Sequence, residues 1–256
     1  MSDLQKKAKS RIYFASDFHL GVPDAWASAE RERRIVRWLD CIEENAKEIF
    51  LLGDVFDFWF EYRDVVPKGY VRLLGKLATM ADNGCKIHFV CGNHDLWTRD
   101  YFEKDLGFII HRSAFETIID GKRFLIGHGD GLDFSDRKYR FISRLFKSRF
   151  CVAAFAALHP RWAYAIGKTW SRKSRLSHSE SDKVNLYEQE PIYKYCMAEL
   201  DKRNIDFFVF GHRHLKCNLS LKNGSRYINT GFWATESPYA EWDGENLCLK
   251  NFDLGE

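Results

Sequence analysis

The sequence lacks the features of membrane-spanning and disulfide-rich secreted proteins. No hydrophobic run approaches the roughly 20 residues needed to cross a bilayer. The opening residues, MSDLQKKAKS, are not followed by an apolar segment of signal-peptide length. The seven cysteines are odd in number and contain no CxxC pair, which disfavours a zinc ribbon and a disulfide framework. We therefore expect a cytosolic protein.

What is present is the composition of a soluble globular protein. Of the 256 residues, 45% are hydrophobic and 29% are charged, which is enough for a sizeable core and argues against disorder. No internal repeat or low-complexity linker divides the chain. We expect one domain over residues 1–256 that carries an insertion.

Positive charge is concentrated in one segment. Eleven of the 39 Lys and Arg residues lie between Arg137 and Arg175, a stretch without Asp or Glu. The rest of the chain therefore has 28 basic residues against 36 acidic ones, a balance of about −8. This asymmetry indicates an anionic partner for the basic segment.

Apolar periodicity predicts a β-α-β-α-β order at the start of the chain. Strands are expected at 11–16, 48–52 and 87–90, and helices at 28–46 and 69–82. Ser28 is the expected N-cap of the first helix. This order is typical of a sheet that is covered by helices.

A second group of strands is expected further along. The runs at 115–119 and 123–126 flank Asp120-Gly121, which is a hairpin signal. A helix is expected at 191–203 and a strand at 205–210. Short strands, with turns at Asn223-Gly224 and Asp243-Gly244, complete the chain.

Five of these strands end in side chains of the kind that bind metal ions. In chain order they are Asp17 and His19, Asp54, Asn93 and His94, His128, and His212 and His214. Ligands of α/β sheets gather where strands end, so convergence on one crevice is the simplest account. Isolated histidines at buried strand ends would lose hydration without gaining partners.

The donor set indicates the metal. Carboxylates, imidazoles and a neutral amide, with no thiolate, suit Mn²⁺, Fe²⁺ or Zn²⁺. These side chains are too many for one catalytic ion that keeps an open position. They fit two ions about 3.5–4 Å apart that share a carboxylate, as in two-metal hydrolases.

The ordered motifs D-x-H, GD-x-x-D, GNHD, GHGD and GHRH, which span residues 17–214, resemble those of the calcineurin-like metallophosphoesterases. The resemblance implies an α/β, four-layer fold with two β-sheets flanked by helices. It implies two divalent ions, Mn²⁺ above all, bound by two sets of residues that share Asp54 as the bridge. These sets are Asp17, His19, Asp54 and His214 for one ion, and Asp54, Asn93, His128 and His212 for the other.

The same resemblance makes Asp54, Asn93 and His94 the catalytic residues. His94 would contact the scissile phosphate, where it stabilises charge or protonates the leaving oxygen. Asp57 is expected to orient a ligand or to hydrogen-bond the backbone. Packing, turn or surface roles are expected for the remaining motif acids and histidines: Asp95, Asp130, His88, His111 and His159.

The insertion at about 136–185 is expected to be a helical cap. Its positive charges are combined with aromatic and aliphatic side chains at helical spacing. Three interpretations are open: a solvated basic hairpin, a nucleic-acid surface, or an amphipathic cap that meets an anionic membrane and holds acyl chains. The apolar run Phe150–Leu158 favours the third, so nucleic acid is not expected as a partner. No protein partner is predicted.

The position and character of this insertion are similar to those of the UDP-2,3-diacylglucosamine hydrolases of lipid A biosynthesis. The resemblance implies cleavage of that substrate's pyrophosphate to UMP and 2,3-diacylglucosamine 1-phosphate (lipid X). It also implies a peripheral location on the cytoplasmic face of the bacterial inner membrane. Asp136, Ser174 and His178 would contact the nucleotide-sugar head group.

One departure keeps alternatives open. His94 stands where the best-known branch of these enzymes has Arg. A soluble-substrate phosphodiesterase, phosphatase or nuclease of the same family is therefore the alternative. A third hypothesis is a metal-stabilised binding module, which the phosphate-facing imidazole of His94 opposes.

Overall fold

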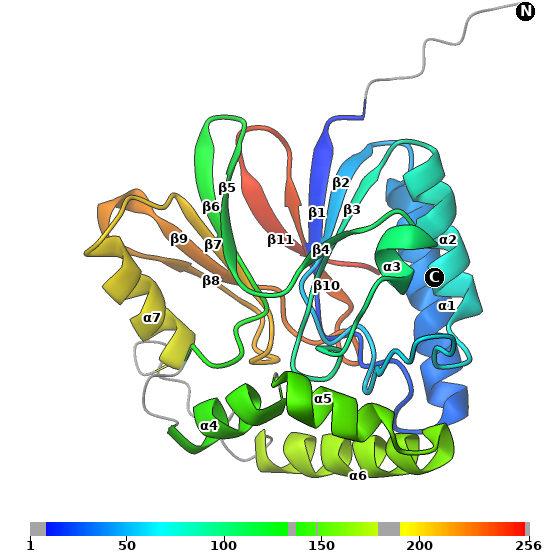
Figure 1. Cartoon of the computed structure of the whole chain (residues 1–256). Helices are drawn as coiled ribbons and strands as arrows, with labels where there is room; N and C mark the ends of the chain where they lie inside the picture. The colour runs from blue at the N-terminus through cyan, green and yellow to red at the C-terminus, as the bar shows by residue number, and fades with distance from the viewer. Residues whose placement is uncertain (1–8, 133–136, 147, 179–189, 254–256) are drawn as a thin grey trace, which may run out of the picture.

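The computed structural model describes residues 9–132, 137–146, 148–178 and 190–253, and it gives no side-chain placement for 137–140 and 172–178. Within these ranges the strands form two sheets, and helices cover their outer faces (Figure 1).

The first sheet has six strands in the order β11-β10-β1-β2-β3-β4. Its parallel strands are β1 (Arg11–Ala15), β2 (Ala46–Leu51), β3 (Lys86–Val90) and β4 (Ile109–His111). The hairpin of β10 (Pro238–Trp242) and β11 (Leu247–Asn251) extends the sheet, with β10 antiparallel to β1. Its turn contains Asp243-Gly244, as the sequence predicts.

The second sheet has five strands in the order β5-β6-β7-β9-β8. They are β5 (Phe115–Ile119), β6 (Lys122–Ile126), β7 (Phe207–Phe210), β8 (Cys217–Ser220) and β9 (Arg226–Asn229). Asp120 and Gly121 join β5 to β6 with positive φ angles of 47° and 79°, so the predicted hairpin is confirmed. The predicted turn at Asn223-Gly224 lies in a short 3-10 helix, Lys222–Gly224, between β8 and β9.

Helices complete the outer layers. α1 (Ala25–Ile42) and α2 (Val71–Asp82) pack on the first sheet, beside the one-turn α3 (Tyr101–Lys104), and α7 (Pro191–Leu200) packs on the second (Figure 1). The predicted four-layer α/β arrangement is therefore confirmed.

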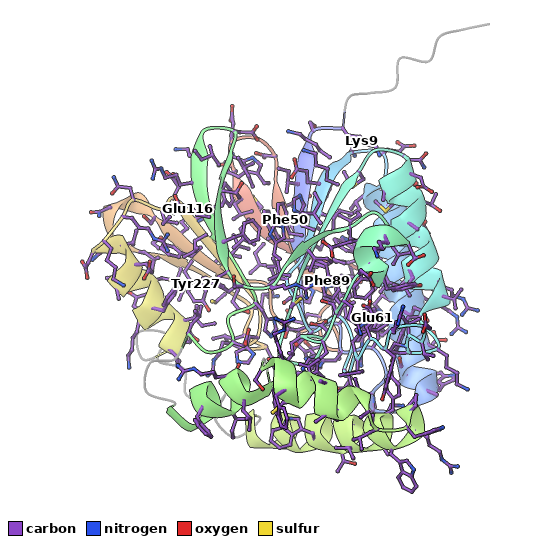
Figure 2. The ribbon with its side chains drawn as sticks, in the orientation of Figure 1. Lys9, Phe50, Glu61, Phe89, Glu116 and Tyr227 are labelled. Carbon is purple, nitrogen blue, oxygen red and sulfur yellow. The ribbon has the colours of Figure 1, made fainter. Side chains whose placement is uncertain are left out.

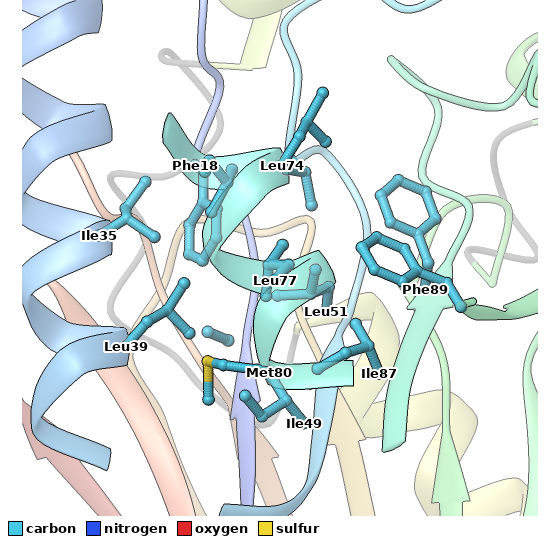
Figure 3. Packing of buried hydrophobic residues seen from close by; sticks show 14 of the residues in the cluster. Phe18, Ile35, Leu39, Ile49, Leu51, Leu74, Leu77, Met80, Ile87 and Phe89 are labelled. Carbon is cyan, nitrogen blue, oxygen red and sulfur yellow. The ribbon is translucent and has the colours of Figure 1, made fainter. Parts of the chain in front are cut away.

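Strand alternation explains why the layers are held together. In β1, Tyr13 and Ala15 face α1 and α2, whereas Ile12 and Phe14 face the second sheet. Phe14 stacks on Phe124 of β6 across the two sheets, with ring centroids 6.1 Å apart. Figure 3 shows how α1 and α2 contribute Ile35, Leu39, Leu77 and Met80 to the outer core.

Three labelled residues mark the three apolar layers in Figure 2. Phe89 lies in the layer between the first sheet and its helices, Phe50 between the sheets, and Tyr227 between the second sheet and α7. Each of these layers is buried, so both sheets are fixed against each other and against their helices.

The prediction of Ser28 as an N-cap is wrong. The helix begins three residues earlier, because Asp24 accepts a hydrogen bond from the backbone of Ala27 at 2.9 Å and caps it. Ser28 is instead buried within α1, where its hydroxyl accepts from the backbone of Gly21 at 2.7 Å. The predicted C-terminal end at Ala46 is also wrong, since α1 ends at Ile42 and Ala46 begins β2.

The basic segment forms a helical cap, as predicted. Its helices are α4 (Arg137–Phe146), α5 (Arg149–Ala156) and α6 (Pro160–His178), which we call the cap. The cap lies across the edge at which β1, β2, β3 and β6 end (Figure 1). No helix within the described residues is both long enough and apolar enough to span a bilayer.

Contacts with the loop after β2 hold α6 in place. The Tyr164 hydroxyl donates to the carbonyl of Phe60 at 2.6 Å. A Cβ at Gly167 would collide with the ring of Phe58, so the helix backbone lies directly against that ring. One helical turn later, this contact brings Ser171 to the strand ends.

Candidate metal centre

The structure brings the predicted ligands together at one edge of the two sheets. Each follows the carboxyl end of a strand: β1, β2 and β3 of the first sheet, and β6 and β7 of the second. The residues are Asp17, His19, Asp54, Asn93, His94, His128, His212 and His214. Ligand-type atoms of seven of them, all but Asn93, form three overlapping groups, in each of which the atoms lie within 4.8 Å of one another.

One group consists of Asp17, His19 and His214. The Nε2 atoms of the two imidazoles lie 3.0 Å apart. Asp17 Oδ1 lies 3.3 Å from His214 Nε2 and 3.7 Å from His19 Nε2. Because Asp17 Oδ2 accepts from the backbone of His212 at 3.0 Å, Oδ1 is left to face the imidazoles.

A second group consists of Asp54, His128 and His212, with Asn93 beside it. His128 Nε2 lies 3.2 Å from His212 Nδ1 and 3.1 Å from Asn93 Oδ1. Each of the two groups combines side chains that follow strands of both sheets, so the site lies where the two sheets meet.

Asp54 lies between the two groups. Its Oδ1 accepts a hydrogen bond from the backbone of His94 at 2.9 Å. Its Oδ2 lies 3.6 Å from His19 Nε2 and 3.3 Å from His128 Nε2. A carboxylate in this position is the geometry expected of a bridge between two ions.

The backbone of the site is strained. Five of the candidate ligands have positive φ angles between 42° and 69°: Asp17, His19, Asp54, His212 and His214. Non-glycine residues seldom adopt this region, and such strain is concentrated at functional sites. The left-handed turns aim successive side chains of D-x-H and H-x-H into the same crevice.

Gly92 allows two loops to approach each other. A Cβ at this position would collide with the Asp54 carboxylate and would lie 2.6 Å from its backbone nitrogen. Asp95 then ties the loops together, since its carboxylate accepts from the backbone of Gly92 at 2.7 Å and of Val55 at 2.8 Å. The turn role expected for Asp95 is confirmed.

The site is electrostatically suited to cations. Burial opposes the ionisation of Asp54, but His128 and His94 outweigh it and hold the pKa of this carboxyl well below its usual range. Burial lowers the pKa of the His128 imidazole, yet the adjacent Asp54 raises it to about 10. Asp17 also has a lowered pKa, because the adjacent imidazoles of His19 and His214 outweigh its burial.

The hydrogen-bond network shows that the residues fit divalent ions. The Nδ1–H of His128 donates to the carbonyl of Leu52 at 2.7 Å, so the tautomer assigned from this contact leaves a lone pair on Nε2. That lone pair faces acceptor oxygens of Asn93 and Asp54. Opposed acceptors require a positive charge between them, either a proton or a metal ion. Asp17 Oδ1 is likewise buried without a hydrogen-bond partner among the described residues.

His94 is oriented by contacts on its far side. Its Nδ1 lies 2.8 Å from the carbonyl of Asp57 and 3.0 Å from the hydroxyl of Ser171. Its Nε2 therefore points into the site, 3.8 Å from Asp54 Oδ2. Burial lowers the pKa of His94 to about 4. Asp57 also faces His19, with its Oδ1 3.5 Å from His19 Nδ1.

An apolar cavity of about 220 Å³ adjoins His94. The core contributes Phe58 and Trp97, and the cap contributes apolar side chains from all three helices: Phe146, Cys151, Phe155, Ile166 and Trp170. Asn93, His94 and Ser171 line its polar end. The cavity is therefore apolar over most of its wall and reaches the candidate metal centre at its polar end.

The predicted head-group residues lie outside the side chains that the structure describes. Asp136 lies outside the described residues, and Ser174 and His178 belong to the part of α6 whose side chains are not placed. Their assignment stays a prediction.

Ser171 is a site residue that the sequence did not predict. It is buried within the site, 77 positions after its partner His94. Nothing in the local sequence separates it from the other serines of the basic segment. His88 and His111 lie away from the site, stacked between Phe50 and Phe115, which agrees with the packing roles expected for them.

Comparison with known proteins agrees with this geometry. Residues 10–216 match the family described as calcineurin-like phosphoesterase. A UDP-2,3-diacylglucosamine hydrolase from Porphyromonas gingivalis is 38% identical over 258 residues, which covers 96% of this chain and 98% of the relative. One from Edwardsiella ictaluri is 25% identical over 241 residues, covering 92% and 90%. The chain therefore belongs to the calcineurin-like phosphoesterase family, and it is a metal-dependent hydrolase.

Proposed function

We propose that the protein hydrolyses the pyrophosphate bond of UDP-2,3-diacylglucosamine, releasing UMP and 2,3-diacylglucosamine 1-phosphate in lipid A biosynthesis. The observation that carries the proposal is the apolar cavity that opens on Asn93 and His94. A substrate with both a pyrophosphate and acyl chains suits a site that is polar at one end and apolar at the other. The two curated relatives support this choice by name.

Two divalent ions are assigned to the candidate metal centre. We place one ion with Asp17, His19, Asp54 and His214, and the other with Asp54, Asn93, His128 and His212. Mn²⁺ is the proposed metal, because the oxygen and imidazole donors suit it, with Fe²⁺ and Zn²⁺ as the alternatives. When bound, such ions lower the pKa of a water and neutralise phosphate charge.

The protein's own residues position the substrate around these ions. His94 presents Nε2 to the phosphate while Asp57 holds its Nδ1, so the imidazole can carry charge or a proton toward the leaving oxygen. Asn93 lies at the mouth of the cavity, where its amide can hold a phosphate oxygen. Asp136, Ser174 and His178 are proposed to contact the nucleotide-sugar head group.

The cap is also proposed to dock on an anionic membrane. Phe150 is 82% exposed and Trp162 is 67% exposed, and neither has a place in the apolar cavity. Arg149 and Arg161 are exposed beside them in the sequence. Exposed aromatic and basic side chains together favour an anionic bilayer surface, here the cytoplasmic face of the inner membrane.

An assay in mixed detergent micelles tests the activity. With Mn²⁺ present, we expect release of UMP from UDP-2,3-diacylglucosamine, and loss of this release when the metal is chelated. Efficient cleavage of a soluble phosphodiester without any release of UMP would overturn the lipid substrate in favour of a soluble one.

A further inference from the structure

Ser171 is the one buried polar group among the cap side chains that the structure describes. Its side chain is 2% exposed. A buried hydroxyl is costly unless it is hydrogen-bonded, so its partners indicate its role.

Two of these partners, Asp57 and His94, belong to the reacting centre. The Ser171 hydroxyl donates to Asp57 Oδ2 at 2.6 Å and lies 3.0 Å from His94 Nδ1. The Nδ1–H of His94 is thereby shared between the Ser171 oxygen and the carbonyl of Asp57, 2.8 Å away. The other oxygen of Asp57 faces the Nδ1 of His19 at 3.5 Å. One hydroxyl of the cap is therefore linked to His94 and, through Asp57, to His19.

The docking of α6 determines where this hydroxyl lies. Ala163, Gly167 and Ser171 are spaced four residues apart, so they share one face of the helix. Ala163 is fully buried, and Gly167 packs against Phe58 with no room for a Cβ. The hydroxyl reaches Asp57 because the cap is seated on the loop after β2.

We propose that Ser171 is a positioning residue, which fixes the His94 imidazole and the Asp57 carboxylate and so couples the seating of the cap to hydrolysis. The inference rests on the proposed function, in which His94 faces the substrate phosphate. Ser171 reaches the reaction only through His94 and Asp57. Removing its hydroxyl leaves one acceptor fewer for Nδ1–H and frees the carboxylate that steadies His19.

A purely structural role for Ser171 makes a different prediction. If the hydroxyl only anchors α6, its loss disturbs the apolar cavity and raises KM for the lipid substrate. A positioning role instead lowers kcat for any phosphodiester, including one too small to enter the cavity.

The test uses bis(p-nitrophenyl) phosphate with the Mn²⁺-loaded full chain. We expect Ser171→Ala to lower kcat about 10- to 100-fold, the usual range for groups that orient a ligand, with KM changed less than about twofold. Metal content should stay that of the wild type. Ser171→Thr, which keeps a hydroxyl, should recover most of kcat. The matched control is Thr169→Ala, which removes an exposed hydroxyl bonded to Ala165 of the same helix and should change nothing.

Three outcomes would overturn the proposal: an unchanged kcat in Ser171→Ala, a loss confined to KM, or a wild type that does not cleave this diester at all. The lipid assay is independent of this result. If the wild type cleaves the small diester but releases no UMP from UDP-2,3-diacylglucosamine, the proposed substrate is rejected. The role of Ser171 is then still decided by comparing kcat of the variant and the wild type on the small diester.

Discussion

Among single residues, Asp54 is the one whose carboxylate contacts both halves of the candidate metal centre. Its backbone is left-handed, its Oδ1 is held by the backbone of His94, and its Oδ2 faces imidazoles from both halves of the site. No other described carboxylate lies between the two groups of candidate ligands.

Removing this carboxylate should therefore empty both ion positions. We expect Asp54→Ala to lose both ions and to lower activity at least about 10³-fold, because neither half keeps a full set of oxygen donors. Elemental analysis of the purified protein measures the ion content. Asp64→Ala, at an exposed acid in the loop that precedes α2, is the control and should keep two ions. Two ions per chain in Asp54→Ala would contradict the bridging role.

The candidate ligands could be predicted residue by residue, whereas Ser171 could not. Asp17, Asp54 and His128 occur in short motifs at strand ends, so local sequence carries the signal. Ser171 owes its role to partners 77 and 114 positions away. Its environment depends on how α6 seats on the core, which no local pattern encodes.

At the level of secondary-structure elements, close approach of the loops after β2 and β3 shapes the site. We expect Gly92→Ala to destabilise the protein by about 1–3 kcal/mol and to impair ion binding, because the added methyl would displace Asp54. Thermal unfolding and elemental analysis measure the two effects.

Gly75→Ala is the matched control. Gly75 lies within α2 with nothing near its would-be Cβ, so alanine should stabilise the helix by about 0.5–1 kcal/mol. Equal effects of the two substitutions would show that crowding at Gly92 is not what matters.

The cap provides a second test at this level. Replacing Phe150 and Trp162 together by alanine should weaken binding to vesicles that contain phosphatidylglycerol roughly tenfold, since both lose apolar area from the bilayer interface. Co-sedimentation at low and high salt measures the binding. Ile118→Ala removes an exposed side chain on β5, which joins β6 at the end of the sheet away from the cap (Figure 1), and should bind like the wild type. Undiminished binding by the double variant would exclude the cap as the membrane-facing surface.

Long elements were predictable and short ones were not. The helices at 69–82 and 191–203 and the hairpin around Asp120-Gly121 appear with small shifts of their ends. α3 and β4 have only four and three residues, too few for a periodic pattern. Backbone groups at the start of α3 are instead bound by Glu61, about 40 positions earlier.

In the molecule as a whole, a seam of stacked rings joins the two sheets away from the candidate metal centre. His111 of β4 stacks on Phe115 of β5 with ring centroids 3.7 Å apart. His88 Nδ1 lies within hydrogen-bond distance of His111 Nε2, at 3.0 Å. Burial, together with His88, lowers the pKa of His111 to about 4.

This seam predicts a pH dependence of stability. Between pH 6.5 and pH 4 the unfolded chain protonates His111 and the folded chain does not, so the free energy of unfolding falls as the pH falls. His111→Phe keeps the ring stack but cannot be protonated, so its free energy of unfolding should not fall in this way. Between pH 7 and pH 4.5 we expect the variant to lose about 1 kcal/mol less of its free energy of unfolding than the wild type, a value reduced because His111 is partly exposed. Urea unfolding at each pH measures the difference.

Ile118→Ala is the control for this pH series. Ile118 is exposed on β5 and does not titrate, so its replacement should give a difference from the wild type that does not vary with pH. A His111→Phe difference that is equally flat would contradict the burial argument.

Strand order was the part of the architecture that the sequence could not predict. β9 inserts between β7 and β8, and β10 returns across the molecule to pair with β1. The β1–β10 pairing joins segments far apart in the chain, the β7–β9 pairing passes over β8, and alternation within a strand does not identify its neighbours.

The span of the candidate ligands has a consequence for biosynthesis. They run from Asp17 to His214, and both sheets must be docked before the crevice exists. By the proposed assignment, a chain leaving the ribosome lacks one ion position until His212 has emerged and the other until His214 has emerged, and both require that β7 has joined β6. We therefore expect metal to be bound only after both sheets have docked. We also expect incomplete chains to be inactive, because they lack part of the ligand set.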